Sequence, residues 1–344
     1  MSQHLLEVKD LYFSFDTYAG EVQAVRGVSF HVDEGETLAI VGESGCGKSV
    51  TVQTIMGLTP TPPGRIKSGS ILYQGRELVG LNHKEMAKLR GKEMAMIFQD
   101  PMTCLNPTMR VGRQIEEAIL KHESVTRLEA HKRACEMLGK VGIPEPEKNA
   151  RRYPHQFSGG MRQRVMIAMA LSCNPRILFA DEPTTALDVT TQAQILDLMN
   201  ALKHEFRAAV VIITHDLGVV ARVSQRVNVM YAGKIVESGN VRDVFYQPKH
   251  PYTWGLMQSL PGQSGSNSRI LTAIEGTPPD LFAPPAGCGF APRCAYCMQG
   301  CLGVQPSMTD IGGGHGAACH LLNPRAPKVE IPIAIQKGGE IIGE

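Results

Sequence analysis

The sequence predicts an α/β protein built on a mostly parallel β-sheet, and three observations support this fold class. Up to about residue 245, short β-branched runs alternate with amphipathic segments, which is typical of a sheet covered by helices on both faces. A glycine-rich stretch ending in Lys-Ser directly follows one expected strand. Another expected strand ends in two acidic residues, at the tip where open α/β sheets bind ligands.

The expected elements follow from hydrophobic periodicity. The expected strands span residues 22–32, 37–41, 94–98, 177–180, 210–214 and 226–230. The expected helices span residues 48–56, 160–172 and 190–206. Residues 111–141 are almost purely helical in pattern, so we expect a helical insertion there.

The composition excludes some classes of function. The chain has 35 basic and 33 acidic residues, and a formal charge of only +2 argues against nucleic acid as the main partner. No apolar run approaches the roughly 18 residues that a bilayer crossing needs. The first residues, Met1–His4, lack the order of a signal peptide. We therefore expect a cytosolic chain that needs other subunits for any role at a membrane.

The glycine-rich stretch at 42–49 fits G-x-x-x-x-G-K-[ST] at every fixed position. Its glycines allow backbone N–H groups to face an anion, and the following helix adds the positive end of its dipole. Lys48 would reach the β- and γ-phosphates, and the Ser49 hydroxyl would ligate Mg²⁺. The flanking strand and helix argue against a chance match in a glycine-rich turn. The candidate nucleotide ligands here are Gly42, Ser44, Gly45, Cys46, Gly47, Lys48, Ser49 and Val50.

The two acids at the tip of the strand at 177–180 are Asp181 and Glu182. Asp181 would hold Mg²⁺ through its water shell, and Glu182 would polarise the water that attacks the γ-phosphate. The alternative is a solvated strand end, which becomes less convincing beside the phosphate-binding pattern.

Residues 157–164 resemble the signature sequence of the ABC ATPases, in a variant of Leu-Ser-Gly-Gly-Gln with Met161 at the last place. Ser158, Gly159 and Gly160 open a helix whose free N–H groups can face a phosphate. In this family the signature faces the ATP that the opposite subunit holds. The resemblance implies a mostly parallel core sheet, an antiparallel β subdomain and a helical subdomain, with ATP and Mg²⁺ as cofactors.

Other marks of the family follow in the expected order. Gln99 matches the Q-loop, which senses Mg²⁺ and water, and Asp188 matches the D-loop at 186–188. His215 matches the switch histidine that contacts the γ-phosphate. Phe15 lies where the family stacks an aromatic ring on adenine, with Tyr12 and Phe13 as close competitors.

Three segments resemble the motor subunits of bacterial dipeptide and oligopeptide importers. They are 101–107, 111–115 and the run His250–Thr253, which precedes a cysteine-rich stretch. This resemblance implies two transmembrane permease subunits, an extracytoplasmic substrate-binding protein and a second ATPase, different rather than identical. It also implies a place at the cytoplasmic face of the plasma membrane.

The sequence also bears on alternative functions. Related importers carry nickel or other small solutes, so peptide is not the sole possible substrate. Non-transport ABC ATPases usually carry coiled-coil insertions or two cassettes, and the sequence shows one signature and no heptad run. An exporter would need a fused membrane domain, and no apolar run in the sequence is long enough for one. Glu182 and His215 argue against a non-catalytic binding module.

Composition changes near Gln247, where prolines become frequent and residues 262–268 read Gly-Gln-Ser-Gly-Ser-Asn-Ser. This is linker chemistry. We expect an ABC ATPase domain over 1–246 with its helical subdomain at about 100–172, a linker over 247–287, a cysteine-rich metal-binding extension over 288–322 and a tail over 323–344.

The cysteines of the extension over 288–322 suggest a metal-binding site. Cys288, Cys294, Cys301 and Cys319 resemble the four-thiolate [4Fe–4S] site of peptide-importer motors. The additional Cys297 makes a C-x-x-C arm with Cys294, so Zn²⁺ is an alternative, with His315 or His320 as substitute ligands. Plain buried thiols are the third possibility. Cys46 is a separate case, either a reactive thiolate beside a helix N-terminus or a small residue standing where serine would serve.

Overall fold

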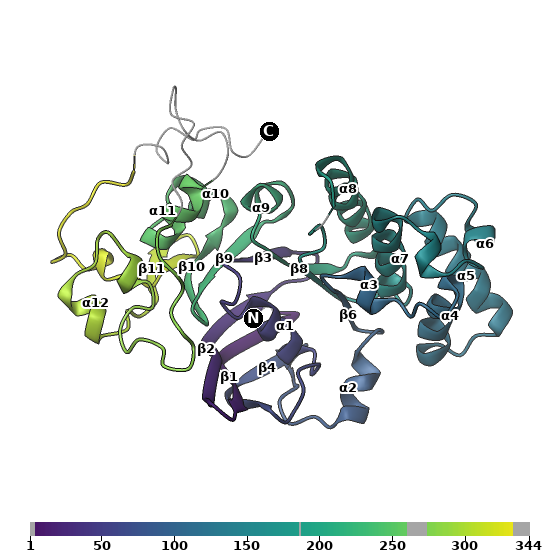
Figure 1. Cartoon of the computed structure of the whole chain (residues 1–344), viewed down its shortest axis with the longest axis horizontal. Coiled ribbons are helices and arrows are strands. Elements are labelled where there is room, and N and C mark those ends of the chain that lie inside the picture. The colour runs from purple at the N-terminus through teal and green to yellow at the C-terminus, as the bar shows by residue number, and fades with distance from the viewer. Residues whose placement is uncertain (1–3, 186, 260–273, 333–344) are drawn as a thin grey trace. The chain divides into compact units, whose positions relative to one another are not determined.

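The computed structural model describes residues 4–185, 187–259 and 274–332 of the 344-residue chain (Figure 1). The chain divides into two compact units. Unit 1 takes residues 1–31, 38–79 and 214–344, and unit 2 takes residues 32–37 and 80–213. Ala186, the Gly/Ser run at 262–268 and the end of the expected tail, 333–344, lie outside the described residues.

Unit 1 contains a four-stranded sheet of order β2-β1-β4-β5, in which β4 runs antiparallel to β1 and β5. Its strands are β1 (Leu6–Thr17), β2 (Gly20–Val32), β4 (Gly64–Tyr73) and β5 (Arg76–Glu77). The hydrophobic pattern predicted only β2. A bulge between Lys9 and Tyr12, with Asp10 at a left-handed φ of 44°, breaks the alternation of β1 and hides it from a periodicity argument.

The other strands of unit 1 follow the order β11-β12-β10-β9-β3. They are β3 (Thr37–Val41), β9 (Arg226–Tyr231), β10 (Lys234–Asn240), β11 (Thr309–Gly312) and β12 (His315–Ala317). β3 and β9 are parallel, whereas β9, β10, β12 and β11 pair antiparallel in turn. Two strands of the cysteine-rich part thus extend a sheet of the nucleotide-binding part. The structure groups the expected extension over 288–322 with the nucleotide-binding part in one unit.

The helices of unit 1 are mostly short. They are α1 (Lys48–Ile55), α9 (Leu217–Val223), α10 (Val241–Tyr246), α11 (Pro251–Gln258) and α12 (Gln299–Gly303). Helix α11 lies within the stretch expected as a linker. Pro251 stands at its first position, where a backbone N–H is not needed, and His250 caps it. Helix α11 buries Tyr252 and Trp254, so this part of 247–287 belongs to the core of the unit.

Unit 2 contains the parallel strands β6 (Met94–Ile97), β7 (Ile177–Asp181) and β8 (Ala209–Thr214) in the order β8-β7-β6. All three strands are buried along their length, as expected for parallel strands between helical layers. The α/β class predicted from the sequence is confirmed. The bounds of these strands differ from the predicted bounds by a residue at most.

The helices of unit 2 include the expected helical insertion, which consists of several pieces. They are α2 (His83–Leu89), α3 (Pro101–Cys104), α4 (Val111–His122), α5 (Arg127–Lys140), α6 (Pro146–Asn149), α7 (Gly159–Leu171) and α8 (Val189–Phe206). Helices α4, α5 and α7 pack on one another (Figure 1). Helix α5 starts where the Thr126 side chain accepts a hydrogen bond from the Glu129 N–H.

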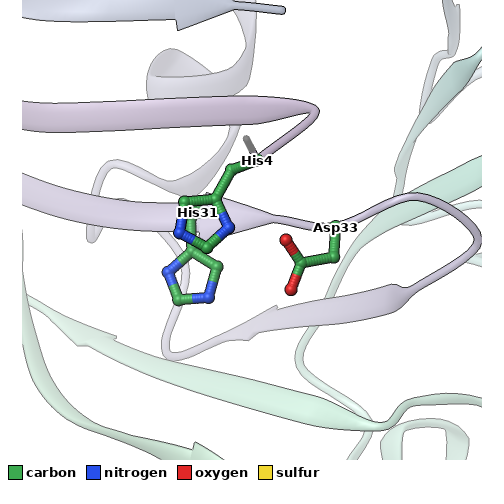
Figure 2. A group of neighbouring side chains, drawn as sticks. All are labelled: His4, His31 and Asp33. Atoms are coloured by element: carbon green, nitrogen blue, oxygen red, sulfur yellow. The ribbon is translucent and has the colours of Figure 1, made fainter. Parts of the chain in front are cut away.

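Stacked imidazole rings hold the start of β1 against β2. The His4 and His31 ring centroids are 4.0 Å apart with an interplanar angle of 29°. Figure 2 shows the two rings face to face, with Asp33 two residues further along the chain from His31.

No helix within the described ranges combines the length and the apolar composition needed to cross a membrane.

Candidate active site and cysteine cluster

The phosphate-binding loop of unit 1 joins β3 to α1, and its shape requires glycine at two places. Gly42 and Gly47 adopt φ values of 152° and 99°. A Cβ atom on Gly42 would lie 2.1 Å from the Met230 carbonyl oxygen, and one on Gly47 would lie 2.3 Å from the Ala24 carbonyl oxygen. The loop is thus pressed against neighbouring backbone, which leaves no room for a side chain.

Lys48, the first residue of α1, is almost fully buried at 5% exposure. Its Nζ donates to the carbonyl oxygens of Gly42, at 2.7 Å, and Glu43, at 2.9 Å. These bonds hold the ammonium group across the loop, where it can meet phosphate oxygens. Ser49 follows in the first turn of the helix. Both residues therefore stand where the sequence pattern predicts them.

Cys46 is buried inside this loop, with its Sγ 3.9 Å from the Lys48 Nζ. Burial raises the pKa of Cys46, and the nearby Lys48 charge opposes this only in part. The thiol therefore stays protonated at neutral pH. The structure favours a small residue in place of serine over a reactive thiolate.

The three aromatic candidates for adenine stacking differ in exposure. Phe13 is buried and packs edge-on against Phe15, with ring centroids 5.1 Å apart. Tyr12 is exposed, but its ring lies over Gly27, so that side of the ring is covered by backbone. Phe15 is half-buried near the end of β1, so it combines a supported ring with an accessible face.

The acidic residues predicted for catalysis end β7 in unit 2. Asp181 is buried, and Glu182 adopts a left-handed backbone with φ of 46°. The Glu182 N–H donates to the Ile213 carbonyl oxygen at 2.9 Å. A non-glycine residue in this conformation costs about 1–3 kcal/mol and is typical of functional sites.

Two donors meet the Glu182 carboxylate. The Gln99 Nε2 lies 3.1 Å from the Glu182 Oε2, and the Thr185 Oγ1 lies 2.9 Å from the same oxygen. Gln99 was predicted from the sequence, and the structure brings it to Glu182. Thr185 was missed, because a threonine three residues after a glutamate carries no distinctive pattern.

The signature residues of unit 2 open α7. The Ser158 side chain caps this helix, and its Oγ accepts a hydrogen bond from the Met161 N–H at 3.4 Å. Gly160 faces α8, where a Cβ atom would lie 2.8 Å from the Thr191 methyl group. The small residues of the signature therefore allow α7 and α8 to approach closely.

Asp188 caps α8 through two bonds to one residue. Its carboxylate accepts from the Thr191 N–H at 2.9 Å and from the Thr191 Oγ1 at 2.7 Å. These bonds lower the pKa of Asp188. Asp188 and Gly160 thus both contact Thr191, so the D-loop and the signature helix are joined by a residue that the sequence did not single out.

His215 belongs to unit 1 and lies between β8 and α9. The next residue, Asp216, caps α9 by accepting hydrogen bonds from the N–H groups of Gly218, at 2.8 Å, and Val219, at 3.3 Å. This cap fixes the backbone at the predicted switch histidine.

Four of the five C-terminal cysteines line one small cavity in unit 1. They are Cys288, Cys294, Cys301 and Cys319. Burial raises the pKa of Cys294 to about 11 and that of Cys319 to about 12. The backbone N–H groups of Tyr296 and Leu321 oppose this by bonding to the two sulfurs. The fifth thiol, Cys297, is exposed and does not line the cavity.

The histidines near the cysteines have different surroundings. His315 Nε2 lies 2.8 Å from the buried Glu237 carboxylate, and His320 Nε2 lies 2.9 Å from the Val304 carbonyl oxygen. His320 and His250 both line the cysteine cavity. The His250 Nδ1 accepts from the Tyr252 N–H, so the ring proton is on Nε2, and this buried atom has no hydrogen-bond partner within the described part of the chain.

A glycine-rich phosphate loop, a strand ending in Asp-Glu and a signature helix together define an ATP-binding cassette ATPase. The chain matches the ABC transporter family over residues 25–185 and the oligopeptide/dipeptide transporter C-terminal region over residues 236–301. It belongs to the family of oligopeptide and dipeptide transport ATP-binding proteins.

Related proteins support this family assignment by sequence and by structure. The chain is 60% identical to the oligopeptide transport ATP-binding protein OppD of Bacillus subtilis, over 96% of this chain and 93% of that protein. It is 51% identical to OppD of Escherichia coli over 92% of each chain. A solved dimeric ATP-binding cassette in a post-hydrolysis state, bound to ADP and Pi, is 29% identical with a TM-score of 0.62. That match covers 69% of this chain and 99% of the solved one.

Proposed function

We propose that this chain hydrolyses ATP to drive the import of oligopeptides or dipeptides through partner membrane subunits. One observation carries the proposal: an intact phosphate loop and an intact acidic strand end occur in a chain that matches peptide-transport ATP-binding proteins along nearly its whole length. ATP hydrolysis would then power an alternating-access change in the partner subunits.

Within this proposal each site residue has a role. Lys48 and the N–H groups of the loop bind the phosphates, and Phe15 stacks on adenine. Ser49, Gln99 and Asp181 hold Mg²⁺, directly or through water. Glu182 polarises the attacking water, which the Gln99 amide helps to orient, and His215 contacts the γ-phosphate.

We infer that ATP is bound between two such ATPases arranged head to tail. Ser158, Gly159 and Gly160, with Asp188, would then face the nucleotide of the opposite subunit. The N-terminus of α7 suits this role, because its first N–H groups and its dipole favour an anion. A similar but different ATPase is the proposed partner. The isolated chain should consequently be a poor ATPase.

The transporter would also contain two permeases and an extracytoplasmic substrate-binding protein, with this chain held peripherally at the cytoplasmic face of the membrane. The test is reconstitution of these subunits in liposomes. We expect ATP turnover to rise with a binding protein loaded with a short peptide. Stimulation by Ni²⁺ instead of peptide would replace the peptide assignment, and robust hydrolysis by monomeric chain alone would contradict the paired arrangement.

We also propose that Cys288, Cys294, Cys301 and Cys319 hold a [4Fe–4S] cluster. Two observations support an occupant of the cavity that they line. The buried His250 Nε2–H there lacks a hydrogen-bond acceptor, and a cluster sulfur would supply one. Backbone N–H groups also bond to the sulfurs of Cys288, Cys294 and Cys319, and these bonds partly offset the burial that raises the pKa values of the three thiols.

The four sulfurs are spaced more widely than a single zinc ion requires. Four thiolates at a zinc–sulfur distance of about 2.3 Å would stand about 3.8 Å apart. Within the described residues, no three of these sulfurs lie within 4.8 Å of one another. A cluster binds each thiolate at a different iron, so its ligands stand further apart. When bound, the group would tie together segments that have little apolar content of their own.

A further inference from the structure

Glu43, the second residue of the phosphate loop, is bonded through all of its polar groups. Its carbonyl oxygen accepts from the Lys48 Nζ at 2.9 Å. Its N–H donates to the Tyr252 hydroxyl at 2.9 Å, and its carboxylate Oε2 lies 2.8 Å from the Arg293 Nη1. The loop lysine is therefore connected, through one residue, to two side chains more than 200 positions further along the chain.

The Arg293 side chain is held rigidly. It is only 6% exposed, and its guanidinium also donates to the carbonyl oxygens of Ile274, at 3.1 Å, and Glu275, at 2.9 Å. A further bond of 3.2 Å reaches the Tyr231 hydroxyl. An arginine with its donors fixed in this way presents a charge of set position, which a flexible lysine would not. The desolvated surroundings strengthen its attraction for Glu43.

The Tyr252 hydroxyl is fixed by ring packing. Tyr252 is fully buried, and its ring centroid lies 4.5 Å from that of Tyr231 and 5.4 Å from that of Phe290. Phe290 and Tyr231 also meet edge to face at 5.3 Å. These three rings come from β9, α11 and the cysteine-rich part, and together they hold the hydroxyl at the Glu43 N–H.

We propose that Tyr252 and Arg293 are positioning residues for ATP binding, acting on the phosphate loop through Glu43. The inference rests on the proposed role of this loop in binding ATP. Without the Tyr252 hydroxyl the Glu43 N–H loses its partner, and the loop must move to find another. That movement displaces the carbonyl oxygen that orients Lys48. The C-terminal region thus sets the nucleotide affinity of the loop, in addition to packing against it.

The test is Tyr252→Phe, which keeps the ring and removes one oxygen. In the full chain, purified anaerobically, we expect the Kd of a fluorescent ATP analogue to rise about tenfold. The midpoint of thermal unfolding and the iron content should change little. In the assembled transporter, KM for ATP should rise with kcat nearly unchanged. A lowered melting midpoint or iron content with unchanged Kd would show a merely structural role and overturn the proposal.

Tyr73→Phe is the matched control, because Tyr73 is a buried tyrosine in β4, outside the loop and its contacts. It should leave the Kd unchanged. Arg293→Met should weaken binding as Tyr252→Phe does, and Arg293→Lys should restore part of it. Glu43→Gln combined with Arg293→Met should cost less than the sum of the two changes. Additive effects would contradict action through Glu43.

Lys48→Ala separates this inference from the proposed function. It should abolish binding of the ATP analogue. If Lys48→Ala binds ATP normally, the loop is not the ATP site, and the proposed function fails with it. If Lys48→Ala fails to bind but Tyr252→Phe binds normally, only the positioning role is lost.

Discussion

The amide Nε2 of Gln99 lies 3.1 Å from the carboxylate Oε2 of Glu182. The two residues are 83 positions apart in sequence and belong to the same unit. A donor at this oxygen orients the carboxylate, which suits a base that must take a proton from a water molecule held in a fixed position.

Glu182→Gln should therefore abolish hydrolysis while it preserves ATP binding. The change keeps the shape of the side chain and removes the base, so we expect turnover in the assembled transporter to fall by about 10²-fold or more. ATP should then trap a closed ATPase dimer, detectable by size-exclusion chromatography. Thr185→Val, which removes only one donor to the same oxygen, should cost about tenfold at most. Near-normal turnover of Glu182→Gln would remove it from this role.

Gly47→Ala should disable the phosphate loop for steric reasons. Its Cβ atom would lie 2.3 Å from the Ala24 backbone oxygen, so the loop must shift. Gly35→Ala is the control, because Gly35 also has a left-handed φ, of 68°, but a Cβ atom there meets nothing within 4 Å. The control should cost about 1–2 kcal/mol in unfolding free energy and leave ATP affinity intact. Unchanged ATP affinity in Gly47→Ala would show that the loop adapts.

Cys46 should resist alkylation in the folded protein. Burial raises its pKa, so at pH 7 the reactive thiolate is scarce, and the sulfur is also shielded from reagent. Cys297 is exposed and should react first with a maleimide. Peptide mass mapping after limited labelling compares the two sites directly. If Cys46 is labelled as fast as Cys297 and ATP protects it, the hypothesis that Cys46 is a reactive thiolate would be favoured instead.

Serine substitutions should separate the proposed cluster ligands from the fifth cysteine. Protein purified without oxygen should be brown and carry about four irons per chain. Iron should be lost on replacing Cys288, Cys294, Cys301 or Cys319, each of which lines the cavity. Cys297→Ser is the matched control and should retain iron. Colourless protein with one zinc per chain would replace the cluster assignment.

Much of the site was predictable because short motifs carry their own chemistry. The phosphate loop and the acids at the tip of β7 lie on elements whose bounds the hydrophobic pattern gave to within a residue or two. The left-handed backbone of Glu182 was not predictable, since it depends on the Ile213 carbonyl oxygen of a neighbouring strand.

Sequence prediction was less successful where one residue type is compatible with two kinds of local structure. Pro251 was taken to mark a linker, yet a proline at the first position starts a helix as readily as it prevents one. The bond between Tyr252 and Glu43 spans 209 positions, and no periodicity reports a contact of that range. A tyrosine after His-Pro shows its role only once the fold brings it to the loop.

The pairing of β10 with β12 limits where the chain can be truncated and how its C-terminal region can be transferred to another protein. Glu237 in β10 is completely buried, and its carboxylate bonds to the N–H groups of Lys249 and His250 and to the His315 ring. A gene boundary after residue 246 would remove all three of these partners and expose the bare edge of β10, which invites aggregation. Loss of the C-terminal region by a single truncation is therefore not a neutral step. A recombination that moved the region to another ATPase would have to carry β10 with it.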